Sequence, residues 1–123
     1  METKIQNFYE LDAWKEGHKL VINIYKITKD FPSEEKFGII SQLRRAASSI
    51  TANIAEGFER YYFNDKIRFY YQARGSFSEV QNFLILSKDL GFISEDVCKT
   101  LTDEYSSVGR LINGLIRSIE KQK

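Results

Sequence analysis

Proline, cysteine and histidine each occur only once in this chain of 123 residues. Residues that interrupt helices, form disulfides or bind metal ions are therefore scarce. A single cysteine excludes a disulfide within the chain, and a single histidine makes no metal site. No apolar run approaches the roughly 20 residues that a membrane span needs, and the first residues lack the order of a signal peptide. We therefore expect a soluble cytoplasmic protein with neither a metal nor a cofactor.

The rest of the composition is that of an ordinary globular chain, with 42% hydrophobic and 28% charged residues. The length fits one domain spanning residues 1–123, and no segment shows the sustained period-two alternation of a strand. Periodic apolar positions instead predict helices over about residues 12–29, 33–56, 65–90 and 95–119. Short connections between long helices favour an all-α, up-down-up-down antiparallel four-helix bundle.

Local signals suggest where these helices begin and end. Ser33 is a candidate N-cap for the second helix, with Gly57 as the residue just beyond its C-terminus. Asn64 is a candidate cap for the third helix, which Gly91 should stop, and Ser94 should cap the fourth. The same signals predict a long, irregular connection between residues 58 and 63.

The second helix carries two ordered rows of side chains. Its apolar row contains Ile40, Leu43, Ala47, Ile50 and Ile54, and its polar row contains Gln42, Arg45, Ser49, Asn53 and Glu56. In an antiparallel pair, Arg45 would lie level with Ser76 and Glu79, and Glu56 level with Lys66. The first interpretation is structural, with Arg44 or Arg45 reaching Glu79. A subunit interface or a ligand site is the alternative.

Positive charge is concentrated in residues 44–74, which carry six basic and three acidic residues, whereas each flanking segment has a net charge of −1. The basic residues are candidates for nucleic-acid binding: Arg44, Arg45, Arg60, Lys66, Arg68 and Arg74. Four aromatic residues fall in or beside the predicted connection: Phe58, Tyr61, Tyr62 and Phe63. A monomer that exposed all four would show a sizeable apolar patch, so we expect another copy of the chain to cover them.

Little in the chain suggests catalysis. His18 lies on an apolar stripe, which favours a packed core or interface residue, and the spacing of Cys98 makes it a small buried hydrophobe. Phosphate-binding glycine loops, zinc spacings and nucleophile elbows do not occur. Gly75 breaks the third helix pattern, which predicts close approach of another helix there. We expect no enzyme and no small-molecule substrate.

Several motifs, in this order, resemble the 23S rRNA intervening-sequence protein family. They are Leu11-x-x-Trp14, Phe31-Pro32, Glu35-x-Phe37-Gly38, Gln42-x-Arg44-Arg45-Ala46-x-x-Ser49-Ile50, Asn53-Ile54-Ala55-Glu56-Gly57 and Gly75-Ser76-x-x-Glu79. The resemblance implies a bacterial, cytoplasmic, ring-shaped homopentamer of four-helix bundles without known catalytic activity. A related branch, the accessory variability proteins of retroelements, binds nucleic acid through a strongly basic surface. The net charge of +1 departs from that branch.

Two functions follow from these observations. The first is a non-enzymatic, oligomeric accessory protein associated with structured RNA or DNA, whose arginines neutralise phosphates. The second is a structural or protein-interaction scaffold whose arginines pair within and between subunits and bind no nucleic acid.

Overall fold

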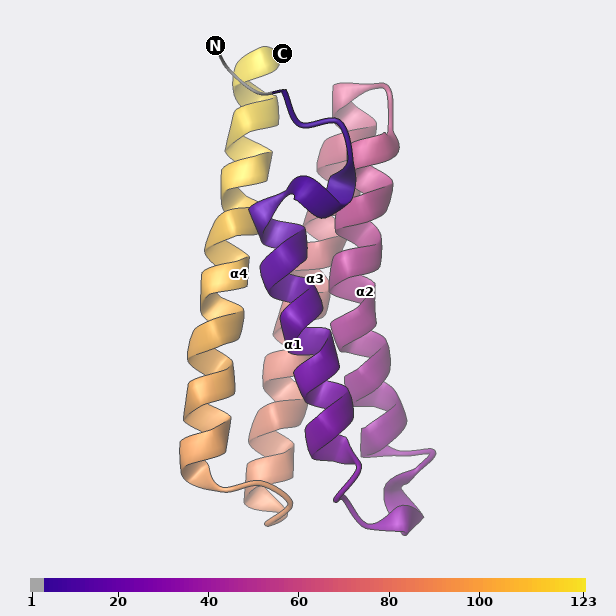
Figure 1. The fold of residues 1–123 in the computed structure, drawn as a ribbon, viewed down its shortest axis with the longest axis vertical. Helices are drawn as coiled ribbons and strands as arrows, with labels where there is room; N and C mark the ends of the chain where they lie inside the picture. Colours follow the sequence, from indigo (N-terminus) through magenta and orange to yellow (C-terminus); the bar gives the residue numbers. More distant parts are fainter. Residues whose placement is uncertain (1–3) are drawn as a thin grey trace.

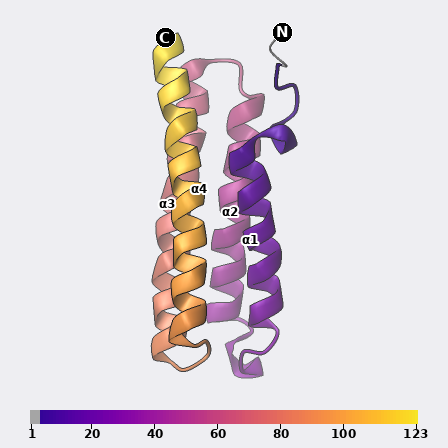
Figure 2. The same ribbon diagram turned by 60° about the vertical axis from the view of Figure 1, so that its left-hand side comes forward.

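The computed structural model describes residues 4–123, which form four long helices and two short 3-10 helices without a strand. The long helices are α1 (Asp12–Thr28), α2 (Ile39–Glu59), α3 (Phe63–Asp89) and α4 (Glu95–Gln122). The short ones are η1 (Phe8–Glu10), which precedes α1, and η2 (Ser33–Glu35), which lies between α1 and α2. The long helices run side by side in alternating directions (Figures 1 and 2), which confirms the predicted all-α four-helix bundle.

The core is formed by the apolar faces that the helical periodicity predicts. All five members of the α2 apolar row are buried, and Leu43 and Ile54 have no exposed surface. Opposite them, α4 contributes Tyr105 and Ile112, which are also fully buried. None of the described helices is long and apolar enough to cross a membrane.

The start of α2 differs from the prediction. Ser33 does not cap it, because residues Ser33–Glu35 form η2 and α2 begins only at Ile39 with Gly38 as its N-cap. The Glu35 carboxylate accepts a hydrogen bond from the Ile39 backbone N–H at 3.4 Å. Phe31, buried beside Ile39, holds this connection against the bundle. Ser33 therefore begins a separate short turn rather than α2.

The end of α2 was also predicted too early. Gly57 is not the residue beyond the helix, since α2 continues to Glu59. Asn64 does not cap α3, which begins at Phe63 with Tyr62 as its N-cap. The connection is only residues 60–62, so Phe58 and Phe63 lie on helices rather than in a loop.

Gly57 allows α2 and α3 to pack closely near the connection that joins them. A Cβ placed on it would lie 2.6 Å from Cε1 of Tyr70 and 3.2 Å from the carbonyl oxygen of Lys66. Gly75 does the opposite of what we predicted, because it is exposed and a Cβ there would meet nothing within 4 Å. The close approach of α2 and α3 therefore occurs at Gly57.

The signals between α3 and α4 are confirmed. Gly91 adopts φ 82° just beyond α3, and the N–H of Phe92 donates to the carbonyl of Ser87 at 2.8 Å. This geometry is a Schellman motif, which favours glycine because of the positive φ. Ser94 caps α4, and its Oγ accepts from the N–H of Val97 at 3.1 Å.

Candidate functional site

The polar row of α2 meets α3 through an ion pair. Arg45 donates from Nη2 to the Glu79 carboxylate at 2.5 Å, and its Nε donates to Gln42 Oε1 at 3.2 Å. The expected cross-helix pair therefore forms with Arg45. Both side chains are about half exposed, at 51% and 44%. The pair thus lies on the rim of the α2–α3 contact and remains accessible to water.

One turn further along α2, a hydroxyl pair joins the two helices, and an amide within α2 supports it. Ser76 Oγ donates to Ser49 Oγ at 2.9 Å, and Asn53 donates to the Ser49 carbonyl at 2.9 Å. Glu56 does not reach Lys66, because it pairs with Arg60 at 3.2 Å along the same helix. The members of the polar row therefore form three separate groups, each with its polar partners within the chain.

Arg44 points to the other side of α2, toward α1. Its Nε donates to Thr28 Oγ1 at 2.8 Å and its Nη2 to the Tyr25 carbonyl at 3.3 Å. The guanidinium lies 4.5 Å from the centre of the Tyr25 ring. These partners orient the arginine without neutralising its charge.

Lys66 has a structural role at the end of α2. Its Nζ donates to the carbonyls of Phe58 at 2.6 Å and Gly57 at 3.4 Å. The last carbonyls of a helix have no partner within the helix, and a cation here donates hydrogen bonds to them. Burial lowers the pKa of Lys66, and the negative charge of Glu59 opposes that shift.

The other three basic candidates contact aromatic rings of α3. Arg60 and Arg68 both lie over the Phe69 ring, at 4.5 and 4.7 Å from its centre. Arg74 lies 4.6 Å from the Tyr71 ring and donates to Asn113 Oδ1 at 3.0 Å.

The six predicted binding residues are therefore spread around the bundle. Arg44 contacts α1, Arg45 contacts α3, and Arg74 contacts α4. Three of the six pair with carboxylates, among them Arg68 with Asp65 at 3.9 Å. The structure does not gather them on one face, and their role in nucleic-acid binding stays a prediction.

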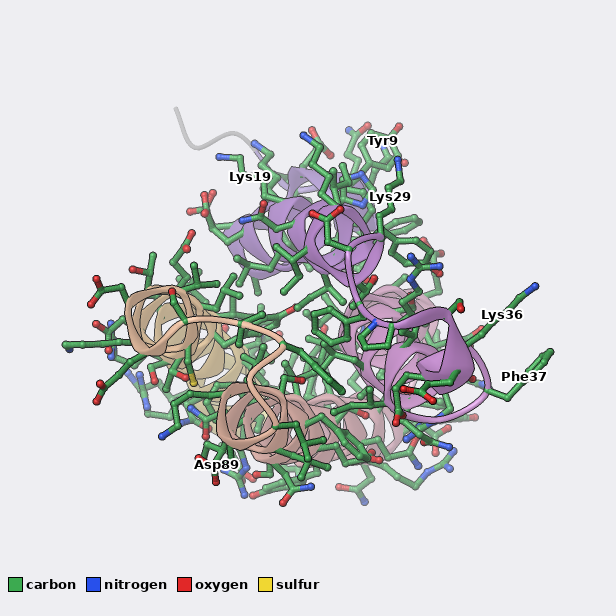
Figure 3. All side chains as sticks on the ribbon, turned by 90° about the horizontal axis from the view of Figure 1, so that it is seen from below. Tyr9, Lys19, Lys29, Lys36, Phe37 and Asp89 are labelled. Atoms are coloured by element: carbon green, nitrogen blue, oxygen red, sulfur yellow. The ribbon has the colours of Figure 1, made fainter. Side chains whose placement is uncertain are left out.

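The aromatic candidates divide into two exposed and two half-buried side chains. Tyr61 and Tyr62 are 86% and 69% exposed and contact each other edge to face, with ring centres 5.0 Å apart. Phe58 and Phe63 are half-buried and line a hollow at the end of the bundle. Phe37 in the α1–α2 connection is 89% exposed and projects away from the bundle (Figure 3). Sequence reasoning did not single it out as a surface residue.

A lysine face on α1 also went unnoticed in the sequence. It consists of Lys15, Lys19 and Lys26 of α1 and of Lys29, the C-cap of the helix, all exposed. At 100° per residue they fall within an arc of about 80°, directly opposite the buried face of the helix. Figure 3 shows Lys19 and Lys29 pointing outward from α1. The net charge of residues 1–43 did not indicate this face, because acidic residues elsewhere in the segment offset the lysines. The spacing of the lysines, four, seven and three residues, does predict it.

The residues considered for catalysis do not come together. His18 is exposed rather than in the core, and its ring stacks on Trp14 with centres 4.5 Å apart. Cys98 is buried as predicted, with Sγ 3.6 Å from the Leu84 carbonyl oxygen. In residues 4–123, no three His, Cys, Asp or Glu side chains are placed to hold a metal ion.

Two tyrosines have strongly raised pKa values. Burial raises the pKa of Tyr70 to about 12 and raises that of Tyr105 further, with a smaller effect from the charge of Glu104. The Tyr105 hydroxyl is buried and has no hydrogen-bond partner in the described part of the chain. Both are core residues whose neutral form the fold favours.

Comparisons with known proteins agree with this architecture. The family model of the 23S rRNA-intervening sequence protein matches residues 9–114. A solved structure of similar fold is a protein of unknown function from the S23 ribosomal protein family of Bacteroides thetaiotaomicron VPI-5482. Its TM-score is 0.79 at 21% identity, covering 85% of this chain and 95% of that one, so the likeness shows the fold alone. A search of curated proteins found no match.

Proposed function

This chain belongs to the 23S rRNA-intervening sequence protein family, and from that premise we propose that it is a cytoplasmic, non-catalytic accessory protein that binds structured RNA through the lysine face of α1. The observation that carries the proposal is the row of four exposed lysines on one face. Only Lys19 pairs with a carboxylate within the described residues, that of Glu16 at 3.3 Å. Both partners are exposed, so the pair is weak and exchanges readily with a phosphate.

The geometry of the lysine face suits a polyanion. From Lys15 to Lys29 the face spans about 21 Å at 1.5 Å per residue, long enough to meet several successive phosphates. Ile22 lies within it and is 45% exposed, so the face offers apolar contact as well as charge. No carboxylate lies between Glu16 and Asp30 in the sequence. The charge of the lysine face is therefore not offset along most of its length.

The test is the salt dependence of binding to structured RNA, with duplex DNA as a second arm. Four phosphate contacts predict that the affinity falls roughly 50- to 150-fold between 50 and 200 mM salt. The double variant Lys15→Glu and Lys26→Glu should abolish this binding. Lys36→Glu with Lys121→Glu changes the charge equally outside α1 and should bind more tightly than the α1 variant.

A scaffold without nucleic-acid binding is the second candidate function. It is favoured by the carboxylate partners of Arg45, Arg60 and Arg68 and by the exposure of Phe37 and Tyr61, which suit a protein partner. Wild-type protein that shows no salt-dependent binding to either nucleic acid would support this function and contradict the first.

A further inference from the structure

A shallow groove runs along the outer face of α2, beside α1. Its volume is about 570 Å³, and its floor consists of the small side chains of Ser41, Ser48 and Ala52. Arg44 and Arg45 stand on its two sides, and Tyr25 of α1 completes the wall. Small residues in such a row allow the backbone of another helix to approach closely.

The groove carries positive charge. In residues 4–123, no carboxylate lies within 4 Å of the Arg44 guanidinium, whose two hydrogen bonds leave other N–H groups free. Its position is fixed by Thr28 and by the Tyr25 ring, so little side-chain entropy remains to be lost on binding. The groove therefore favours an acidic, helical occupant.

The first three turns of α4 have the complementary character. Residues 95–104 carry four carboxylates and one lysine, and that lysine, Lys99, pairs with Asp103 at 3.2 Å. Asp96 and Glu104 are exposed, and Val97 between them is 38% exposed. These first three turns of α4 therefore present an apolar side chain flanked by negative charges.

The two surfaces are arranged to meet between copies. Both lie near the end of the bundle that holds the α1–α2 and α3–α4 connections (Figure 1). Seen from that end, α2 and α4 occupy opposite sides of the bundle (Figure 3), so one chain cannot join them to each other. We propose that the acidic first three turns of α4 in one copy dock into the arginine-lined groove of α2 in the next copy.

Such a contact is heterologous, because it joins two different surfaces. Repeating it generates a closed ring when the rotation between copies closes, and an open filament otherwise. Both docking surfaces border α1, because Tyr25 lines the groove, and Asn23 and Ile27 lie beside the acidic residues of α4. The lysine face lies between these two borders, and Figure 3 shows Lys19 and Lys29 pointing outward from α1. Assembly through these two surfaces would repeat the outward-pointing lysine face in every subunit.

Two single variants test the contact by light scattering of nucleic-acid-free protein. Ala52→Glu places a carboxylate in the groove, and Glu104→Lys reverses a charge on α4; both positions are exposed and accept helix formers. Each variant should fall to the 14.4 kDa mass of one chain while the wild type remains assembled. Gln72→Glu on α3 and Glu120→Lys at the other end of α4 are matched controls that should stay assembled.

Mixing provides the decisive outcome. The Ala52→Glu chain retains an intact α4, and the Glu104→Lys chain retains an intact groove, so a mixture should regain a mass above that of either variant alone. A monomeric wild type, an assembled variant or a mixture that stays monomeric would overturn the proposal. If the wild type is monomeric and Ala52→Glu weakens RNA binding, the groove is a phosphate site and the proposed contact is wrong. The Lys15→Glu and Lys26→Glu variant should keep the wild-type mass, which separates this test from that of the lysine face.

Discussion

Substituting alanine at Gly57 and at Gly75 should shift stability in opposite directions, although both glycines lie inside long helices. Removing a mid-helix glycine gains about 1 kcal/mol of helix propensity, which applies to Gly75, and the gain is no larger at Gly57 in the last turn of α2. At Gly75 nothing opposes this gain, since a Cβ there meets no atom within 4 Å. Gly75→Ala should therefore stabilise the protein by about 0.5–1 kcal/mol and raise Tm by roughly 2–4 °C.

At Gly57 the added methyl group meets rigid neighbours. Its Cβ would lie 2.6 and 2.9 Å from two carbons of the Tyr70 ring and 3.2 Å from a backbone oxygen of Lys66. Tyr70 is itself buried and cannot swing away freely. Overpacking of this kind costs about 1–3 kcal/mol, and contact with both a ring and a backbone oxygen places Gly57 at the upper end. After the propensity gain, Gly57→Ala should destabilise by about 1–2 kcal/mol and lower Tm by roughly 4–8 °C.

Thermal and urea denaturation of the two variants and the wild type measure the difference. A Gly57→Ala protein as stable as the wild type, or two variants that shift in the same direction, would refute the packing argument. Combining Gly57→Ala with Tyr70→Leu isolates its cause, because a smaller side chain at 70 should reduce the penalty of the added methyl group. Simple additivity of the two changes would show that the ring is not the obstacle.

Three further substitutions and one pH experiment test the rest of the structure. Glu79→Ala should lower stability by less than about 1 kcal/mol, because the ion pair it removes is half exposed; a larger loss, with Glu120→Ala as control, would contradict this. Tyr105→Phe should stabilise by about 1 kcal/mol, since it removes a buried hydroxyl without a partner, and a fall in Tm would show a hidden partner. Lys66→Met should cost about 1–2 kcal/mol by leaving the last carbonyls of α2 unpaired, whereas Lys36→Met should have little effect. Because burial raises the pKa of Tyr70 from 10.0 to about 12, folding favours its neutral form; Tm should be insensitive to this group below pH 10 and fall as pH rises toward 12, and a flat profile there would contradict the burial.

The fold was predictable because it depends on a pattern that repeats along the chain. Every turn of α2 and α4 carries an apolar residue on the same face, so an error at one position leaves the helix assignment unchanged. Helix ends depend on single residues and were less predictable. Ser94 caps a helix and Gly91 ends one, as their residue types predict. Gly57 and Asn64 are residue types that also favour helix ends, yet they lie within helices.

The candidate site was predicted only in part. Counting residues from an antiparallel turn fixes height, and it predicted that Arg44 or Arg45 reaches Glu79; the structure shows Arg45 as the partner. That count cannot decide which side of a helix faces a neighbour, so it did not show that Arg44 turns toward α1 and Arg74 toward α4. Averaging charge over long segments also obscured the lysine face, since charges distant in sequence contribute to the average without sharing its surface.

By itself, the sequence determined the helical class, the apolar faces and the family motifs, because each depends only on the order and spacing of residues close in sequence. Only the tertiary structure decided what Gly57, Gly75 and the arginines do, because their surroundings come from other helices. It places a tyrosine ring against one glycine and open space beside the other. It also distributes the arginines around the bundle and leaves the lysines of α1 together on one open face. Residue spacing specifies a helix and its faces, whereas the packing of helices decides which charges and surfaces remain free to bind.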